Sequence, residues 1–115
     1  MIRSILAVAL LISSAAEAAQ PGKYNLLGTG TVSCGSWTAW RQHDERGVRV
    51  EALLAEQWVL GFLSGIGYAR AFYGENPLNG LDADAVWTWM DNHCRANPLD
   101  DLAASTAAFA AIHPN

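Results

Sequence analysis

The sequence predicts an all-α fold, a small bundle of about four helices with one disulfide, after a cleaved signal peptide. Three observations lead to this prediction. In each segment after residue 33, apolar residues recur at steps of three and four, which is the period of an amphipathic helix. Polar or glycine-containing breaks separate these segments. The 115-residue chain also contains two widely separated cysteines.

Residues 1–19 are predicted to be a signal peptide. An early arginine supplies the positive charge, residues 5–12 form a short apolar core, and the Ala-Glu-Ala tripeptide at 16–18 has the small-x-small pattern of a cleavage site. Cleavage after Ala18 and after Ala19 fit equally well. The alternative is an uncleaved anchor, but the apolar core is shorter than the roughly 20 residues of a spanning helix. We therefore expect a periplasmic or secreted protein.

The mature chain of about 96 residues is long enough for one small domain. Residues 20–32 are rich in Gly, Asn and Thr and are predicted to form an irregular lead-in. Within them, residues 28–30 (Gly-Thr-Gly) lack the Gly-Lys-Ser/Thr sequence of a phosphate-binding loop. The helical domain is expected to span residues 33–115.

Export determines how the two cysteines are interpreted. In an oxidising compartment Cys34 and Cys94 are expected to form a disulfide. Closing a loop of roughly 60 residues stabilises a fold by about 4 kcal/mol in the chain-entropy model. The alternative is a zinc-binding or nucleophilic cysteine. Neither cysteine belongs to a CxxC pair, and on a helix the side chain of His93 points away from that of its neighbour Cys94.

The first helix is expected to begin near Ser33 or Ser36, either of which can serve as its N-cap. Its inward face is predicted to carry a sulfur and an indole: Cys34, Trp37, and Trp40 or Arg41.

The central helix contains the longest apolar run and is expected from near Val48 to Tyr73. Its predicted buried face comprises Val50, Leu53, Leu54, Gln57, Trp58, Phe62, Ile66 or Leu63, Ala69 and Tyr73. Gly61, Ser64 and Gly65 form a strip of small residues where a second helix is expected to cross closely. A membrane span is the alternative, but Arg70 and the glutamates upstream argue against it.

The segment from Gly74 to Gly80 is predicted to be a loop. Asp82 is the expected N-cap of the third helix. Its buried face is predicted to comprise Val86, Trp89 or Met90, His93 and Cys94. Asn97 followed by Pro98 is expected to begin the last helix. The apolar stripe of that helix is predicted to comprise Leu99, Leu102, Ala103, Thr106, Phe109 and Ala110.

The sequence contains no catalytic motif. Three scattered histidines lack metal-site spacing: His43, His93 and His113. Ser64 lies in Gly-Phe-Leu-Ser-Gly, which is not a nucleophile elbow. A net charge of −4 argues against nucleic acid and anionic lipid as partners. We therefore expect a non-enzymatic protein with no metal and no cofactor that acts by binding another protein.

A family resemblance agrees with this expectation. The signal peptide, the early cysteine, the central Gly-Phe-Leu-Ser-Gly helix, the Trp-containing helix ending in Cys94, and Asn97-Pro-Leu before an alanine-rich end resemble the Rap/Tai type of periplasmic immunity protein. The resemblance covers roughly residues 32–111. It implies a helical bundle, often dimeric, that blocks a secreted peptidoglycan amidase effector with a loop.

The loop implied here lies between Gly74 and Leu81, although no family residue can be transferred onto it by motif. Its candidate partner-binding residues are Glu75, Asn76, Pro77, Leu78 and Asn79. The alternative resemblance is to periplasmic acid-stress chaperones of the HdeA-like kind, which are also small, helical and held by one disulfide. This chain has a single lysine where those chaperones are lysine-rich.

Overall fold

The computed structural model describes residues 22–43 and 46–113, with side chains in the second segment described from residue 49. A short 3₁₀ helix η1 (Thr29–Thr31) precedes four α-helices: α1 (Cys34–Gln42), α2 (Arg46–Ala71), α3 (Ala83–Ala96) and α4 (Leu102–Ile112). The only extended pairing in these segments is an isolated bridge between Ser33 and Asp101. The predicted all-α bundle of four helices with one disulfide is confirmed. The predicted signal peptide lies outside the described residues.

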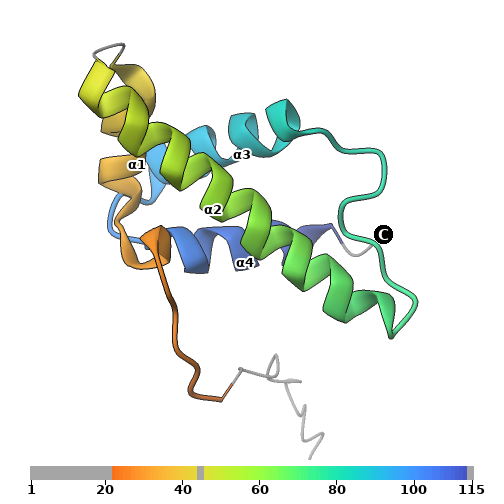
Figure 1. Ribbon diagram of the computed structural model, residues 1–115. Coiled ribbons are helices and arrows are strands. Elements are labelled where there is room, and N and C mark those ends of the chain that lie inside the picture. The colour runs from red at the N-terminus through yellow and green to blue at the C-terminus, as the bar shows by residue number, and fades with distance from the viewer. Residues whose placement is uncertain (1–21, 44–45, 114–115) are drawn as a thin grey trace, which may run out of the picture.

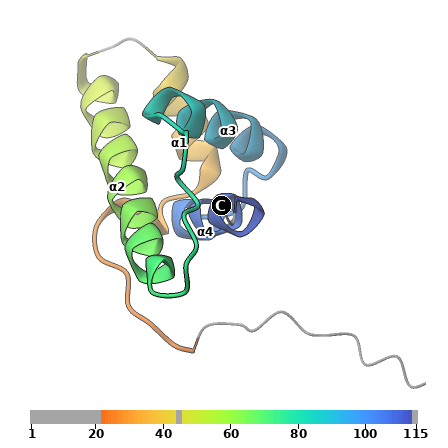
Figure 2. The ribbon, with the colours of Figure 1, turned by 90° about the vertical axis from the view of Figure 1, so that its right-hand side faces the viewer.

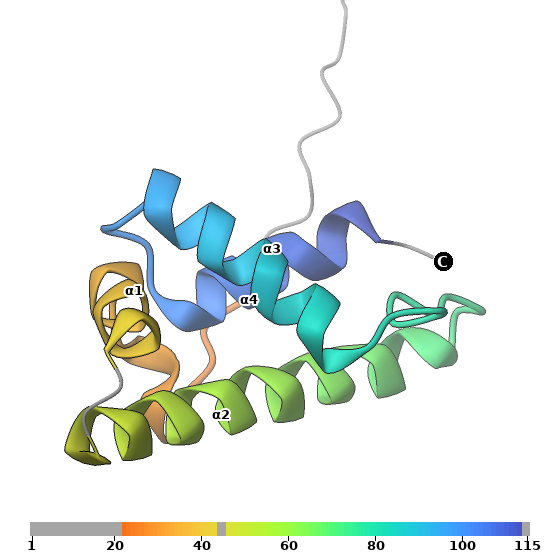
Figure 3. The same cartoon turned by 90° about the horizontal axis from the view of Figure 1, so that it is seen from above.

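Helix α2 lies along one side of the bundle. In Figure 1 α2 crosses in front of the other helices, and in Figure 2 α1, α3 and α4 all lie on the same side of it. Figure 3 shows the same arrangement from above, with α2 at the edge of the molecule. Helices α1 and α4 pack directly on α2, and α3 packs on α1 and α4. One long face of α2 therefore has no other helix of the bundle against it.

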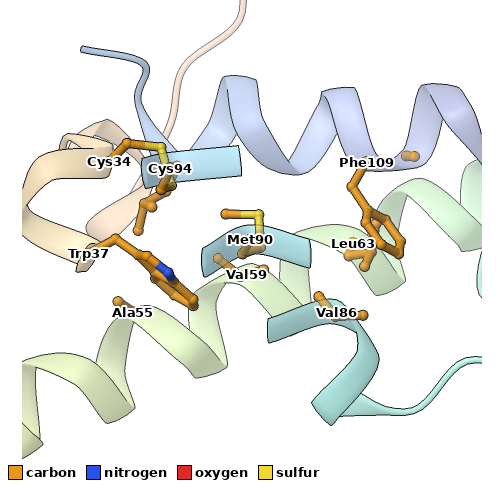
Figure 4. Packing of buried hydrophobic residues seen from close by; sticks show 11 residues of the cluster. Cys34, Trp37, Ala55, Val59, Leu63, Val86, Met90, Cys94 and Phe109 are labelled. Atoms are coloured by element: carbon orange, nitrogen blue, oxygen red, sulfur yellow. A yellow bond between two sulfur atoms is a disulfide. The ribbon is translucent and has the colours of Figure 1, made fainter. Parts of the chain in front are cut away.

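The cysteine pair and the apolar side chains form one core. Cys34 and Cys94 form a disulfide with an S–S distance of 2.10 Å, and neither is exposed. Figure 4 shows this disulfide beside Trp37 at one end of the core, with Leu63 and Phe109 together at the other end. Helix α2 contributes Ala55, Val59 and Leu63 to the core cluster, and α3 contributes Val86, Met90 and Cys94. The disulfide therefore joins the start of α1 to the last turn of α3 inside the core.

Side-chain caps explain where three helices begin. The Ser33 hydroxyl accepts a hydrogen bond from the Ser36 amide at 3.2 Å, and the Asp82 carboxylate accepts one from the Ala85 amide at 2.8 Å. Both predicted caps are confirmed. The first helix begins at Cys34 because Ser33, rather than Ser36, is its N-cap.

The predicted cap of the last helix is wrong. Asn97 is the C-cap of α3, and α4 begins only at Leu102, after its N-cap Asp101. The reason is that residues 98–100 pair with the start of α1. The Gly35 amide donates to the Pro98 carbonyl at 3.0 Å, and the Cys34 amide donates to the Asp100 carbonyl at 2.7 Å. Leu99, predicted on the apolar stripe, is instead 96% exposed.

The predicted buried face of α2 is largely wrong. The residues that α2 buries against its neighbours are Ala52, Ala55, Glu56, Val59 and Leu63. Of the residues predicted to be buried, Trp58, Phe62 and Ile66 are only half-buried. Leu63, the predicted alternative to Ile66, is buried, and the others are exposed. Small residues occupy the inner side of α2, where α1 packs closely. The bulkier Leu and Val side chains lie on another side of the helix, so their spacing predicted the wrong buried face.

The predicted helix crossing is also wrong within the described chain. A β-carbon added at Gly61 or Gly65 would meet no atom within 4 Å. Ser64 is exposed as well, and its hydroxyl donates to the Leu60 carbonyl of its own helix at 2.7 Å. The strip of small residues lies on the side of α2 that points away from the bundle.

Candidate functional site

The side of α2 opposite the core is exposed and largely apolar. We call it the outer face of α2. At 100° per residue it points directly away from the buried residues. Its members are Val50, Leu54, Gln57, Gly61, Gly65 and Tyr68, together with Phe72 directly after the end of the helix, and Leu53 and Ser64 lie along one flank. Tyr68 is 72% and Phe72 76% exposed, and their rings make an edge-to-face pair with centroids 5.5 Å apart.

No charged residue interrupts this face. Of the charged residues whose side chains are described on α2, Glu56 is 2% exposed and points inward to Arg41. Arg70 also points toward the bundle, where it donates to the Ala110 carbonyl at 2.6 Å. Arg49 and Glu51 flank Val50 at the start of the face, and the Arg49 guanidinium lies 3.8 Å from the Glu56 carboxylate. A solvated helix face normally carries charges, so a long uncharged apolar stripe is typical of a surface that binds protein.

The lead-in segment lies along one flank of the outer face. The Trp58 indole nitrogen donates to the Leu27 carbonyl at 2.7 Å, and Gly28 and Gly30 lie against the same indole. Between residues 24–27 and α2 there is an open groove of about 460 Å³. Trp58 therefore holds the lead-in beside the outer face, where residues 24–27 face Gln57 and Gly61 across this groove.

The predicted partner-binding loop continues from the end of α2. The Glu75 amide donates to the Arg70 carbonyl at 3.2 Å, and the Asn79 amide donates to the Asn76 carbonyl at 3.1 Å. Pro77 is buried, so its side chain is not available at the surface, and Leu78 is half-buried against the core.

Asn76 and Asn79 remain exposed beside this anchored turn, and Glu75 is partly exposed while its carboxylate lies 3.7 Å from the Arg70 guanidinium. Sequence reasoning assigned Tyr73 to the core, although it is 84% exposed just before the loop. The signal that could have identified it is the dense aromatic run from Tyr68 to Tyr73 next to a polar loop.

A polar cluster joins three helices on the inner side of α2. The Arg41 guanidinium donates to both carboxylate oxygens of Asp91 at 2.7 Å and to Glu56 Oε1 at 2.7 Å. The Trp37 indole nitrogen also donates to Asp91, at 2.8 Å. Arg41 lies over the rings of Trp37 and Trp87 at 5.5 and 5.7 Å. The cluster thus connects α1 to α2 and α3.

Hydrogen bonds that the guanidinium donates to Asp91 and Glu56 raise the pKa of Arg41 above its ordinary range, against the opposing effect of burial. Because this pKa is raised in the folded state, the resulting stabilisation is fully present below the unfolded pKa and is lost only in strong alkali. The adjoining cavity of about 70 Å³ has room for little more than water. Both carboxylates are bound to the arginine, so the cluster acts as a structural tie.

The other candidates from the sequence are not brought together. His43 is exposed at the end of α1, His93 stacks on Trp89, and His113 stacks on Phe109. In the described residues, no group of three or more His, Cys, Asp or Glu could hold a metal ion. None of the described helices combines the length and the apolar character needed to cross a membrane.

Comparison of the chain with models of known families, with curated proteins and with solved structures gives no match. The functional assignment therefore depends on the site and on the resemblance drawn from the sequence.

Proposed function

We propose that this chain is an exported, non-enzymatic protein-binding domain and that its partner is a secreted cell-wall amidase effector, which it neutralises as an immunity protein. The observation that carries the protein-binding role is the uncharged, apolar outer face of α2. A monomer of this size gains nothing from exposing Tyr68, Phe72 and Tyr73 to water. Large exposed aromatic side chains of this kind are enriched at protein interfaces.

The loop at the end of α2 supports the immunity role more specifically. Its ends are tied by the Arg70 carbonyl and by the Asn76 turn, and Leu78 anchors it to the core. An inhibitory loop needs such anchoring, because ordering a mobile loop on binding reduces affinity. Asn76 and Asn79 are its outward polar groups, next to Tyr73. We assign the partner contact to this loop together with the adjoining end of the outer face.

A second candidate function, an acid-stress chaperone, is supported by the polar cluster. Glu56 and Asp91 hold Arg41 between three helices, and both are carboxylates that acid can protonate. Protonation would remove the charges that pair with the guanidinium and loosen α1 against α2 and α3. Such loosening would expose core surface able to bind unfolded proteins.

The test of the proposed function is capture of partners by the purified, disulfide-bonded protein from a periplasmic and secreted extract, at neutral pH and again near pH 3. The immunity role predicts one stoichiometric partner at neutral pH, a cell-wall amidase whose hydrolysis of peptidoglycan stops at equimolar protein. Broad capture of unfolded proteins only in acid would favour the chaperone. Capture of nothing at either pH would contradict both.

A pair of matched variants locates the surface. Leu54→Lys places a charge on the outer face, whereas Leu99→Lys places the same charge on the loop before α4. Both side chains are exposed, at 55% and 96%, so both variants should fold. Asn76→Ala tests the loop in the same assay. We expect partner capture to weaken in Leu54→Lys or Asn76→Ala and to be unchanged in Leu99→Lys. Equal capture by all variants would place the binding surface elsewhere.

A further inference from the structure

The loop between α2 and α3 contains the only asparagine of the chain that is followed by glycine, Asn79 before Gly80. In Figure 1 this loop lies at the edge of the molecule. The side-chain carbonyl carbon of an asparagine can be attacked by the backbone nitrogen of the next residue, because both groups belong to one chain and meet without a second molecule. Glycine hinders this attack least, since it has no β-carbon. The pair therefore has the composition of a site that modifies itself.

Both reacting groups of this pair are free. Asn79 and Gly80 are exposed. The amides on either side of Gly80 are bonded: the Asn79 amide donates to the Asn76 carbonyl, and the Leu81 amide donates to the Leu78 carbonyl, each at 3.1 Å. Within residues 22–43 and 46–113, the Gly80 amide has no acceptor and the Asn79 side chain makes no hydrogen bond. Neither group therefore has a bond to lose when the two approach.

The turn also allows the approach. The bond from the Leu81 amide to the Leu78 carbonyl closes a β-turn whose central residues are Asn79 and Gly80. Gly80 has a φ of +73°, which is the signature of a type II turn at this position and requires glycine there. Types I and II share the same closing bond and differ in the orientation of the central peptide unit. That unit can therefore rotate the Gly80 nitrogen toward the Asn79 side chain while the closing bond remains.

The other described asparagines are not arranged in this way. Asn76 and Asn97 precede proline, whose nitrogen carries no hydrogen and cannot close the ring. Asn92 lies inside α3, where the helix holds the amide of the next residue. Asn25 is followed by leucine, whose side chain hinders the attack. The loop thus distinguishes Asn79 from every other asparagine of the described chain.

We propose that Asn79 is a site of spontaneous deamidation, which converts the loop from a neutral to a negatively charged form as the protein ages. The Gly80 backbone nitrogen loses its proton to hydroxide and attacks Asn79 Cγ. The N–Cγ bond forms, the Cγ–Nδ2 bond breaks, and Nδ2 takes up a proton and leaves as ammonia. Water then opens the resulting succinimide at either of its two carbonyls, which gives aspartate or isoaspartate. No atom is oxidised or reduced, and water is the one co-reactant.

Either product changes the surface that the loop presents. The Asn79 amide both donates and accepts hydrogen bonds, whereas a carboxylate only accepts. The new charge also adds to a net charge of −4. Isoaspartate in addition routes the backbone through the side chain, which lengthens the main chain inside the turn that positions Leu78. The proposal that this change switches off partner binding rests on the proposed function, because it takes the loop as the partner contact.

The first experiment ages the purified, disulfide-bonded protein at neutral and at mildly alkaline pH and maps it by peptide mass spectrometry, with an isoaspartate-specific methyltransferase to detect isoaspartate. We expect conversion at Asn79, faster at the higher pH because the attacking nitrogen must lose its proton, and none at Asn25 or Asn92. The proposal is overturned if Asn79 stays intact in the native protein under conditions that convert it in the reduced, urea-unfolded chain. Equal conversion of all three asparagines would also overturn it.

A matched pair of variants shows which residue carries the new charge. Asn79→Gln keeps a side-chain amide but lengthens the side chain, which disfavours ring closure. Asn76→Gln makes the same change in the same loop at the asparagine before Pro77. On isoelectric focusing, ageing should give wild type and Asn76→Gln an acidic form and should leave Asn79→Gln unchanged. An acidic form that appears equally in Asn79→Gln would contradict the assignment to this residue.

The functional consequence is tested by capture from the periplasmic and secreted extract at neutral pH. Aged wild type and fresh Asn79→Asp should each bind the amidase roughly tenfold more weakly than fresh wild type, because a lost hydrogen bond and an unpaired charge at a contact cost about that factor. Asn79→Gln should capture as much amidase after ageing as before. Equal capture by fresh and aged wild type would remove the regulatory role.

These measurements separate the modification from the proposed function. Conversion of Asn79 in a protein that captures no amidase would support the modification and remove the proposed function. An intact Asn79 in an aged protein that captures amidase would do the reverse.

Discussion

The polar cluster on the inner side of α2 allows a quantitative prediction about Arg41. The Arg41→Met substitution retains the apolar stem but removes the cation. Glu56, whose side chain is 3% exposed, then loses its hydrogen bond at 2.7 Å and remains as a buried charge, with Arg49 no closer than 3.8 Å. Asp91 loses less, because it is 28% exposed and keeps the Trp37 indole.

Removing one partner of a buried ion pair costs about 3–5 kcal/mol. Because Asp91 is only partly affected, we expect Arg41→Met to lower the free energy of unfolding by about 3–4 kcal/mol. For a domain of this size that is about 15–25 °C in the thermal midpoint. Replacing Glu56 by leucine in the same variant should restore about 2 kcal/mol, because the buried charge is then gone.

Urea and thermal unfolding of wild type, Arg41→Met and the double variant with Glu56→Leu provide the measurement. Since the pKa of Arg41 is raised, the loss should be the same at about pH 7 and about pH 9. A loss below about 1 kcal/mol is the size measured for exposed ion pairs, and it would refute a buried tie. No recovery in the double variant would refute the assignment of the cost to Glu56.

Three further predictions concern the scaffold. Replacing both cysteines with alanine should lower the free energy of unfolding by about 4 kcal/mol, measured by urea unfolding, because the bridge closes a separation of 60 residues; a change under about 1 kcal/mol would contradict this. Asp101→Ala should lower the free energy of unfolding by about 1 kcal/mol, because it removes the N-cap of α4, and Asn97→Ala should lower it by less. A larger loss in Asn97→Ala than in Asp101→Ala would indicate that α4 begins at Asn97. Gly30→Ala should cost about 1–3 kcal/mol in thermal unfolding, because its β-carbon would overlap the Trp58 indole; a neutral result would mean that the lead-in does not pack there.

Features encoded locally were predictable from the sequence. A serine before Cys34 and an aspartate before the third helix are capping signals read over three residues, and both are N-caps in the structure. The disulfide followed from the predicted compartment and the count of cysteines. These inferences needed no knowledge of which helices pack together.

The features that depend on tertiary packing were not predictable. The inner side of α2 at Ala52 and Ala55 is only weakly apolar, so the period of Val50, Leu53 and Leu54 pointed to the wrong side. Which side is buried depends on how closely α1 approaches, and no local pattern encodes that distance. The cluster likewise joins Arg41 to Glu56, 15 positions away, and to Asp91, 50 positions away, and no sequence motif links these residues. The N-terminal half of the candidate surface, at Val50, Leu53, Leu54 and Gln57, is thus a part of α2 that sequence reasoning placed in the core.

Acid is expected to act differently on the two sides of α2. From residue 52 to residue 71 the outer face carries no carboxylate, so protonation cannot act on it directly. Glu56 and Asp91 lie on the inner side, where protonation would loosen the bundle. Glu56→Gln mimics one protonated carboxylate and should reproduce part of the acid effect at neutral pH, with a lower thermal midpoint and increased binding of a hydrophobic dye. Asp84→Asn, on the exposed first turn of α3, is the control. An acid response that is unchanged in Glu56→Gln would place the trigger elsewhere and remove the structural support for the chaperone function.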